Sequence, residues 1–508
     1  MAPHFENSIP SHLLMWQRVR EYAVPPSMIE TATARRAVGD WAGACAAARV
    51  DVDLDLRAVR DRHGTELAGR LRADLRRLAP DLLRWHMPRS APDGLLRAGL
   101  TISLARYGSS GDATPSHLVV RTPPAWADAG QRMSLALWEE SGSGTTPGHA
   151  RHSYPHPHAH AYAHPHAHPH PHAHPHPHPH PHPDRRFRLD LHRHLWDSGR
   201  SGELAWRCGA GGAPNSPWAE ASWAAEAEIL LRAEGRPRGL FAVRLGTRSR
   251  AVLELVAPDD SHAPTFRPLR GPLPPQGIAA LPVLPEAAAR VLPDLELLRN
   301  GLIAADRLHP LVAGALAALG SEAWAGSEPV TGPASTPRLR DPHRVECRGE
   351  VHRIALRDGT LTAVDHHPAQ LRREELLVAF GGPPLPCLRA IDQVHRDPEA
   401  LPAVRERLGH GDIAGALAVV EGLLGPGAVL RDGPLREELE SAAARRIDHG
   451  LFRSGLVAVH PGAGAAAGGK ASLRRYAKAT RHPRLDRLTP PEMQRKRGSR
   501  GRPRTALI

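Results

Sequence analysis

The sequence predicts an α+β fold, built from a helical N-terminal segment, a mostly antiparallel β-sheet domain and a helical C-terminal half with a small β-hairpin unit. Two observations predict it. Apolar residues recur at helical spacing through most of residues 28–90, and helical patterns return over about 285–325 and 370–450. Between these stretches, from Leu100 onward, apolar residues alternate every second position, as on a half-buried strand.

The expected segments follow in order along the 508 residues. They are a helical segment over 1–94, an α+β domain over 95–260 with a disordered His/Pro insertion at 143–184, a Pro-rich linker at 261–283, a helical segment at 284–325, a second linker at 326–342, a small β unit with helices at 343–460, and a disordered basic tail at 461–508. Seven prolines within residues 264–285 favour a linker there.

Alternation and turn residues place the strands. Strands are expected at 100–104, 117–121, 133–137, 187–191, 204–208, 241–245 and 251–256. Ser216 as N-cap, Pro217 in the first turn and Gly235 as the stop predict a helix before the last two strands. Asp358-Gly359, between HRIAL and TLTAV, is the strongest hairpin signal in the chain.

A six-residue pattern occurs twice. Residues 39–44 read GDWAGA and residues 411–416 read GDIAGA, each with helix-forming residues on both sides. The spacing resembles the turn between the two helices of tetratricopeptide-type repeats, in which small residues let the helices approach. No period of about 34 residues links the copies, so two ordinary αα-hairpins are the favoured interpretation.

Residues 152–183 are almost pure His, Pro and Ala, with fourteen histidines. Alternating proline excludes helix and sheet and favours extended polyproline II. The HAH units lack the intervening proline and can fold back on an ion, so weak binding of Zn²⁺, Ni²⁺ or Cu²⁺ is expected there. The candidate metal ligands are His158, His160, His166, His168, His172 and His174.

Two interpretations of this tract stay open. Histidine titrates near a pH of about 6.5, so the tract suits metal storage, metal sensing or a response to acid. It can instead be a low-complexity insertion, which a surface loop tolerates at little entropic cost. The expected strands at 133–137 and 187–191 favour the second interpretation, an overgrown loop that joins them.

The net charge of +13 is concentrated at the C-terminal end. From Lys470 onward, thirteen Lys and Arg stand against two acidic residues. The RGRPR stretch at 500–504 resembles the AT-hook, a peptide that inserts into narrow A·T-rich minor grooves. The expected contacts with DNA or RNA are Arg474, Arg475, Lys478, Arg495, Lys496, Arg497, Arg500, Gly501, Arg502, Pro503 and Arg504. The alternative is a solvated basic tail that binds any polyanion.

Other patterns point to chemistry less strongly. GAAAGGK at 464–470 is close to a phosphate-binding loop, but Ala471 stands where Ser or Thr would reach Mg²⁺, and we interpret it as a linker. The alternating carboxylates of Asp51, Asp53 and Asp55 could bind a divalent cation, although the solvated side of a strand or the approach to a helix is favoured.

A zinc site is conceivable around the small β unit. The ligands would be His343, Cys347, His366 and His367. Their spacing matches no strong zinc-binding pattern, so scattered structural positions are favoured. GxSxG, HExxH and GxGxxG motifs in a suitable context are absent from the sequence, and an enzyme is therefore uncertain and not favoured.

The four cysteines are scattered, which favours a reduced cytoplasm. Neither a signal-peptide pattern nor an apolar run near eighteen residues is found, so export and membrane insertion are not expected. The arginine-rich composition and stretches such as ARRAVGDWAGACAAARVDVDLDLR resemble a Streptomyces-type actinobacterial protein family of unknown function. This resemblance implies no activity.

The sequence as a whole predicts a non-enzymatic adaptor or nucleic-acid-associated protein. Its tail would contact DNA or RNA, and its folded body would contact a protein partner through helical hairpins. One alternative is metal storage or sensing by the His tract, with zinc or nickel bound weakly and no certain cofactor. A second is an enzyme of an unrecognised family with its site in residues 95–260.

Overall fold

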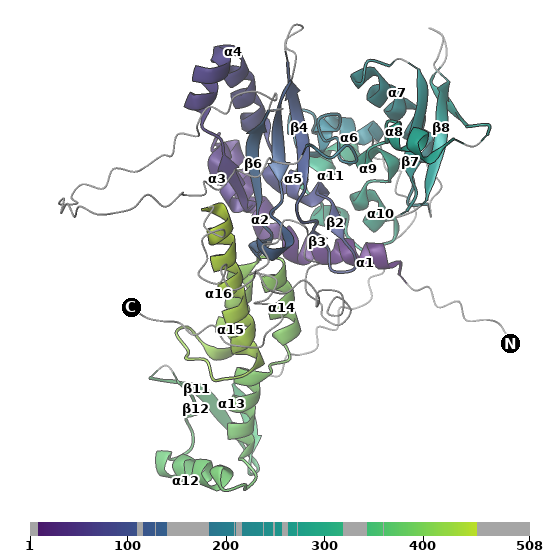
Figure 1. The fold of residues 1–508 in the computed structure, drawn as a ribbon. Coiled ribbons are helices and arrows are strands. Elements are labelled where there is room, and N and C mark those ends of the chain that lie inside the picture. The colour runs from purple at the N-terminus through teal and green to yellow at the C-terminus, as the bar shows by residue number, and fades with distance from the viewer. Residues whose placement is uncertain are drawn as a thin grey trace, which may run out of the picture.

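The computed structural model describes residues 9–454 except 109–114, 128, 140–181, 208, 210–215, 237, 247–248, 257–262, 272, 319–342 and 359. Within this part of the chain the fold is α+β, as the sequence predicts, with a sheet in the N-terminal half and a helical C-terminal half that carries a small sheet (Figure 1). None of the described helices is long and apolar enough to cross a membrane.

The N-terminal half begins with helices that flank a four-stranded sheet. The helices are α1 (Ser11–Arg18), η1 (Val19–Ala23), α2 (Pro26–Ala37), α3 (Trp41–Ala47), α4 (Leu56–Arg77) and α5 (Pro80–His86). The sheet has the order β1-β6-β5-β4, with β1 (Val50–Asp53), β4 (Thr101–Tyr107), β5 (Ser116–Arg121) and β6 (Met133–Trp138). Strands β4, β5 and β6 are antiparallel, as predicted.

Strand β1 interrupts residues 28–90, for which the sequence predicts mostly helical structure. It pairs in parallel with β6, with Val50 opposite Met133. Its two β-branched valines alternate with aspartates, which suits a pleated edge strand. Four residues are too few to stand out in a sequence window dominated by helical spacing. Within α4 the predicted spacing is confirmed, because Leu71 and Leu75 are fully buried.

The chain that follows the His tract differs from prediction. Phe187 and Leu189 are buried, yet they lie in turns and not in a strand. Side chains two residues apart stabilise these turns, since Asp184 accepts a hydrogen bond from the Arg186 backbone N–H (2.9 Å) and Arg188 pairs with Asp190 (2.8 Å). The predicted strand at 204–208 is also wrong, because Leu204–Arg207 forms the short helix α6.

A second, three-stranded antiparallel sheet follows. It consists of β7 (Gly239–Arg244), β8 (Arg250–Val256) and β9 (Thr265–Pro268), covered by α7 (Trp223–Ala233). The first two strands confirm the prediction. The third strand lies in the segment predicted to be a linker and corrects that prediction. Thr265 and Phe266 pair with β8, and Pro268 ends this edge strand, where its missing N–H costs little. Helix α8 (Pro275–Ala280) also lies in that segment.

The predicted helix from Ser216 to Gly235 starts later than expected. The Ser216 hydroxyl caps only a turn, accepting from the Trp218 backbone N–H (3.2 Å), and a 3₁₀ turn, η6 (Glu220–Ser222), precedes α7. Its end is as predicted, since Gly235 has φ +71° just after the last turn.

Three more helices follow, of which the first packs on the β7–β9 sheet and the other two return to the N-terminal core. They are α9 (Glu286–Ala289), α10 (Pro293–Arg299) and α11 (Pro310–Ala317). Leu295 and Val312 share one buried cluster with Leu71 and Leu82. The described part of the segment predicted at 284–325, up to residue 318, therefore packs with the N-terminal body.

The C-terminal half has its own core. A sheet of β10 (Arg344–Cys347), β11 (Glu350–Arg357) and β12 (Thr360–Ala363) precedes α12 (Pro368–Ala379), α13 (Pro386–Arg396), α14 (Leu401–Gly409), α15 (Ile413–Leu424) and α16 (Pro434–Arg453). The predicted hairpin is confirmed, because Arg357 pairs with Thr360 and Asp358 has φ +54°.

The repeated six-residue pattern forms two αα-corners of the same construction, as predicted. Gly39 and Gly411, with φ of +78° and +79°, end α2 and α14. Asp40 then caps α3 by accepting from the Gly43 backbone N–H at 2.8 Å, and Asp412 caps α15 by accepting from that of Gly415 at 3.2 Å.

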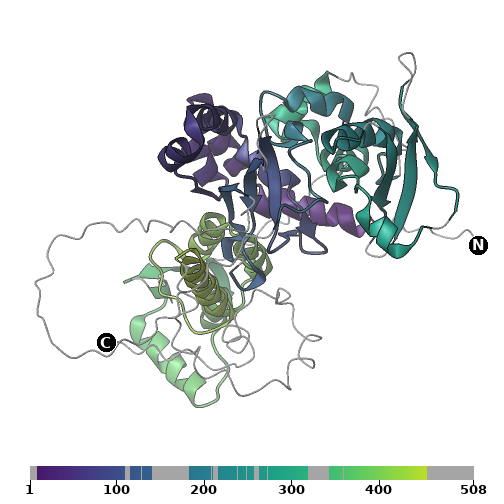
Figure 2. The ribbon, with the colours of Figure 1, turned by 45° about the horizontal axis from the view of Figure 1, so that its top comes forward.

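The two halves meet at the second of these corners. Arg49, just before β1, donates to the His410 carbonyl (2.8 Å) and pairs with Asp412 (3.3 Å). At the end of α16, Arg453 pairs with Asp53 of β1 (2.5 Å). In Figures 1 and 2 the C-terminal half accordingly lies against the N-terminal helices and away from the β7–β8 strands.

Candidate metal centre

A set of buried metal-ligating side chains lies at one end of the C-terminal sheet. Cys347 is the last residue of β10, beside a two-residue hairpin turn. Arg348 and Gly349 form that turn with φ of +56° and +85°, as a type I′ turn requires. The turn fixes the register so that Cys347 points into the core and is fully buried.

Two further ligand candidates come from the helical side of the same unit. His366 lies between β12 and α12, and Cys387 is the second residue of α13. Both side chains are buried. The donor atoms of Cys347, His366 and Cys387 all lie within 4.8 Å of one another, which sets this group apart among the described residues.

The donor set fits a zinc ion. Zinc binds thiolate at about 2.3 Å and imidazole at about 2.0–2.1 Å on a tetrahedron, so its ligand atoms stand roughly 3.3–3.8 Å apart. Burial, and then a hydrogen bond with Cys347, raise the pKa of the Cys387 thiol to about 12. A bound cation makes the thiolate the stable form instead, and the N-terminus of α13 adds partial positive charge beside it.

One ligand candidate has an unsatisfied nitrogen. The Nε2 atom of His366 is buried and makes no hydrogen bond within the described structure. A buried polar atom without a partner is costly, and its presence next to two thiols indicates a position that suits a cation.

No family model, curated protein or solved structure matches this chain. The assignment of function therefore depends on the residues of the site.

Two of the four zinc ligands considered from the sequence converge and two do not. Cys347 and His366 belong to the site, contrary to the preference for scattered positions. His367 instead caps α12, where its Nδ1 accepts from the Ala369 backbone N–H (3.3 Å), and the His343 carbonyl accepts from the Ile354 N–H (2.7 Å). Cys387 was missed, although it is the other cysteine of this half and follows a proline at a helix start.

The other predicted site residues lie outside the part of the chain that the structure describes. These are the His-tract ligands His158, His160, His166, His168, His172 and His174, and the basic residues from Arg474 to Arg504.

The three alternating aspartates do not form a cation site. Asp51 pairs with Arg132, Asp53 pairs with Arg453, and Asp55 caps α4 by accepting from the Ala58 N–H (3.1 Å). Burial raises the pKa of Asp51, but hydrogen bonds from His449 and Arg132 outweigh it and hold that pKa well below its usual range. The favoured interpretation is confirmed for the helix approach at Asp55, whereas Asp51 and Asp53 lie on a strand side that arginines cover, with side chains only 20% and 28% exposed.

Buried polar pairs in the N-terminal body are structural. His309 Nε2 lies 2.9 Å from Asp81 Oδ2, and both side chains are fully buried. The indole N–H of Trp85 donates to Asp294 (2.6 Å) in the same region. Both pairs lie deep in the core cluster, where a substrate cannot reach them.

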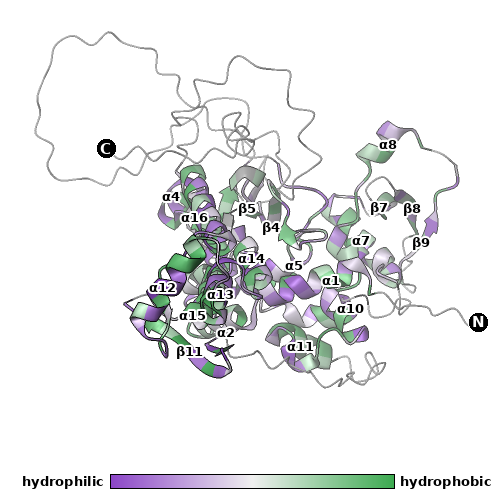
Figure 3. Cartoon of the chain, turned by 90° about the horizontal axis from the view of Figure 1, so that it is seen from below, coloured by the Kyte–Doolittle hydropathy of each residue, from purple (hydrophilic) through white to green (hydrophobic). Residues whose placement is uncertain are grey.

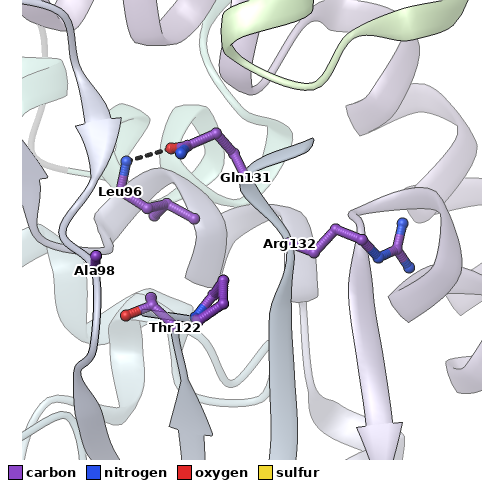
Figure 4. A pocket seen from close by; sticks show the side chains of 6 residues that line it. Leu96, Ala98, Thr122, Gln131 and Arg132 are labelled. Atoms are coloured by element: carbon purple, nitrogen blue, oxygen red, sulfur yellow. Dashed lines mark hydrogen bonds between the residues drawn. The ribbon is translucent and has the colours of Figure 1, made fainter. Parts of the chain in front are cut away.

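A small hollow in the N-terminal sheet does not provide an active site either. Leu96, Gln131 and Arg132 are among its lining residues (Figure 4), and they leave essentially no room in it even for a water molecule. Substrate pockets usually measure about 300–1,000 Å³. The side-chain carbonyl of Gln131 accepts a hydrogen bond from the Leu96 N–H across it, which serves the backbone.

Proposed function

We propose that this protein is a non-enzymatic adaptor whose C-terminal unit binds one zinc ion through Cys347, His366 and Cys387. The observation that carries the proposal is the convergence of three buried donor atoms from three separate elements. A set of two thiolates and an imidazole binds zinc in preference to magnesium or calcium.

The expected role of the ion is to hold the unit together. Cys347 ends β10, His366 precedes α12 and Cys387 lies in the first turn of α13, so the ion would cross-link the sheet to both helices. Structural zinc contributes its binding free energy directly to folding. The unit is small, and metal is a common supplement to a small hydrophobic core.

An apolar surface at the end of α12 supports the adaptor part of the proposal. Leu376, Leu377 and Phe380 are exposed there, the last to 88%. Figure 3 shows hydrophobic and hydrophilic residues mixed along this helix. Large exposed apolar side chains that lie together favour contact with another protein.

The test is metal analysis of the purified chain after dialysis against a moderate chelator, which removes weakly held ions from the His tract. We expect one retained zinc per chain, lost in Cys347→Ser and Cys387→Ser. Cys45→Ser is the matched control, because Cys45 is buried in the N-terminal core, where burial raises its thiol pKa to about 12. Zinc retained in all three variants, or in none of the proteins including the unsubstituted chain, would contradict the proposal.

We propose the nucleic-acid role of the tail as a second function. Its support is the sequence alone, with eleven of the thirteen net charges located after Gly469. Fluorescence anisotropy with A·T-rich and G·C-rich duplexes at two salt concentrations compares the full chain with one that ends at Gly469. Tail-dependent binding with an A·T preference indicates minor-groove recognition, and equal, salt-sensitive binding indicates phosphate contacts only. Binding unchanged by the truncation refutes the proposal.

A further inference from the structure

The two cysteines of the candidate metal centre lie close enough to react with each other. The sulfur atoms of Cys347 and Cys387 are within 4.8 Å, and a hydrogen bond joins the two thiols. Both cysteines are free and fully buried. A disulfide needs its sulfur atoms about 2.05 Å apart, so a short approach of the two side chains would form the bond.

A bound metal ion changes the reactivity of this pair. Without metal, burial raises the pKa of the Cys387 thiol to about 12, and a protonated thiol is a poor nucleophile. A cation that both sulfurs bind keeps them as thiolates, which are the form that oxidants attack. The geometry therefore brings two oxidisable sulfurs together on one ion.

Helix α12 depends on the third ligand of the centre for its attachment. Of the residues of α12, all of which the structure describes, only Leu371 is buried. An ion pair between Glu374 and Arg348 of the β10–β11 turn (2.8 Å) adds a partly exposed contact. His366, just before α12, would be fixed by the ion. In contrast, α13 packs on β10 and β12 and buries Ile391 besides Cys387.

We propose that Cys347 and Cys387 are a redox pair, which a hydroperoxide oxidises to a disulfide with release of zinc and of the start of α12. This inference rests on the proposed zinc binding and adds its regulation. The disulfide would still join the end of β10 to the start of α13. It would have no bond to His366, so the helix that carries the exposed Leu376, Leu377 and Phe380 would lose its attachment while α13 keeps one.

The reaction is a two-electron oxidation of the two thiolates. One thiolate attacks the O–O bond and becomes a sulfenic acid, while the other peroxide oxygen leaves and takes up a proton to give an alcohol, or water from hydrogen peroxide. The second thiolate then attacks the sulfenic sulfur, the S–S bond forms, and the hydroxide that leaves is protonated to water. Two thiolates, one hydroperoxide and two protons thus give one disulfide, one alcohol and one water.

Peroxide treatment of the zinc-bound full chain tests the proposal. Zinc held weakly by the His tract is first removed by dialysis against a moderate chelator. Hydrogen peroxide is then added, released zinc is measured, and mass spectrometry of proteolytic fragments identifies the cysteines that are joined. We expect one zinc ion released for each Cys347–Cys387 disulfide, and rebinding after reduction with dithiothreitol in the presence of zinc. A chain with Cys45→Ser and Cys208→Ser, which keeps only this pair, is the matched control and should react equally.

Hydrogen exchange separates oxidation from simple loss of metal. The unsubstituted chain is compared in its zinc-bound, its oxidised and its reduced, chelated state, so the test does not require a variant to fold. We expect faster amide exchange in α12 in both zinc-free states. The first turns of α13 should stay protected in the oxidised state and lose protection in the reduced, chelated state, because only the disulfide replaces the cross-link to β10.

The outcomes separate the two proposals. If the untreated chain holds no zinc through Cys347 and Cys387, the zinc proposal itself fails. If it holds zinc but peroxide gives sulfinic acids, or a disulfide with another cysteine, or a Cys347–Cys387 disulfide that retains zinc, the centre stands and the redox pair is refuted. Equal exchange of α12 in all three states would overturn the release of that helix.

Discussion

The two αα-corners allow one substitution to be compared at two positions of the same construction. Asp40 caps α3 and pairs with Arg35 (3.2 Å), whose side chain is exposed. Asp412 caps α15 and pairs with Arg407 (2.7 Å), the residue that matches Arg35. Only Asp412 also pairs with Arg49, across the contact between the two halves.

The expected costs differ because of that third contact. Asp40→Ala loses a helix cap, about 1 kcal/mol, and an exposed ion pair of about 0–1 kcal/mol. Asp412→Ala loses an equivalent cap and leaves Arg49 without its carboxylate, although the side chain of Arg49 is only 15% exposed. Breaking a buried ion pair costs about 3–5 kcal/mol. Arg49 keeps its hydrogen bond with the His410 carbonyl, which reduces this cost, so we expect cap and ion pair together to lower the free energy of unfolding by about 4 kcal/mol.

Guanidinium unfolding followed by circular dichroism measures both variants, and hydrogen exchange shows which helices open. We expect Asp412→Ala to lose about 2–3 kcal/mol more than Asp40→Ala, with faster exchange in α14 and α15. Combining Asp412→Ala with Arg49→Ala should recover part of the loss, because the unpaired charge is removed. Equal losses at the two corners would show that the Arg49 pair does not couple the halves.

Two further predictions concern buried side chains. Burial, and then the nearby Arg89 and Arg84, lower the pKa of His410 to about 3, so the folded protein does not take up the proton that the unfolded chain binds below a pH of about 6.5. The free energy of unfolding is then highest above that pH and falls by about 1.4 kcal/mol per pH unit on acidification towards pH 3. In unfolding curves at pH 5 and pH 7, His410→Gln should reduce the dependence of this free energy on pH by that amount. An unchanged pH dependence would contradict the lowered pKa of His410. Trp85→Phe should cost about 2–4 kcal/mol, because it removes the indole N–H that donates to buried Asp294. Trp206→Phe, at a residue that is 70% exposed, should stay within about 0.5 kcal/mol. Similar losses for both variants would show that the buried hydrogen bond adds little.

Local signals in the sequence predicted local structure well. The hairpin at Asp358 and the corners at Asp40 and Asp412 were predictable because each depends on a few neighbouring residues with positive φ or a capping side chain. The alternation of β4 to β6 was also informative, since alternate apolar residues such as Ile102, Val120 and Leu135 belong to the main buried cluster.

Structure that depends on distant partners was not predictable in this way. Strand β1 exists because Val50 meets Met133, more than eighty residues later in the chain. Phe187 and Leu189 alternate like strand residues, yet their burial comes from turns that Asp184 and Arg188 hold. The candidate metal centre brings Cys347 close to Cys387, forty residues later in the chain, so no short spacing could reveal it.

The end of α16 has a mechanical consequence. Its last residue, Arg453, is held by Asp53 on the edge strand of the N-terminal sheet. The chain from residue 455 onward is therefore attached at the boundary of the two halves and not at the far end of the C-terminal unit. A pulling force on that segment would enter the molecule through α16, which packs on the C-terminal core through Leu435 and Ala442 and pairs with β1 through Arg453. Both halves would therefore share the tension, and the partly exposed Arg453–Asp53 pair would yield before the packed core of the C-terminal unit.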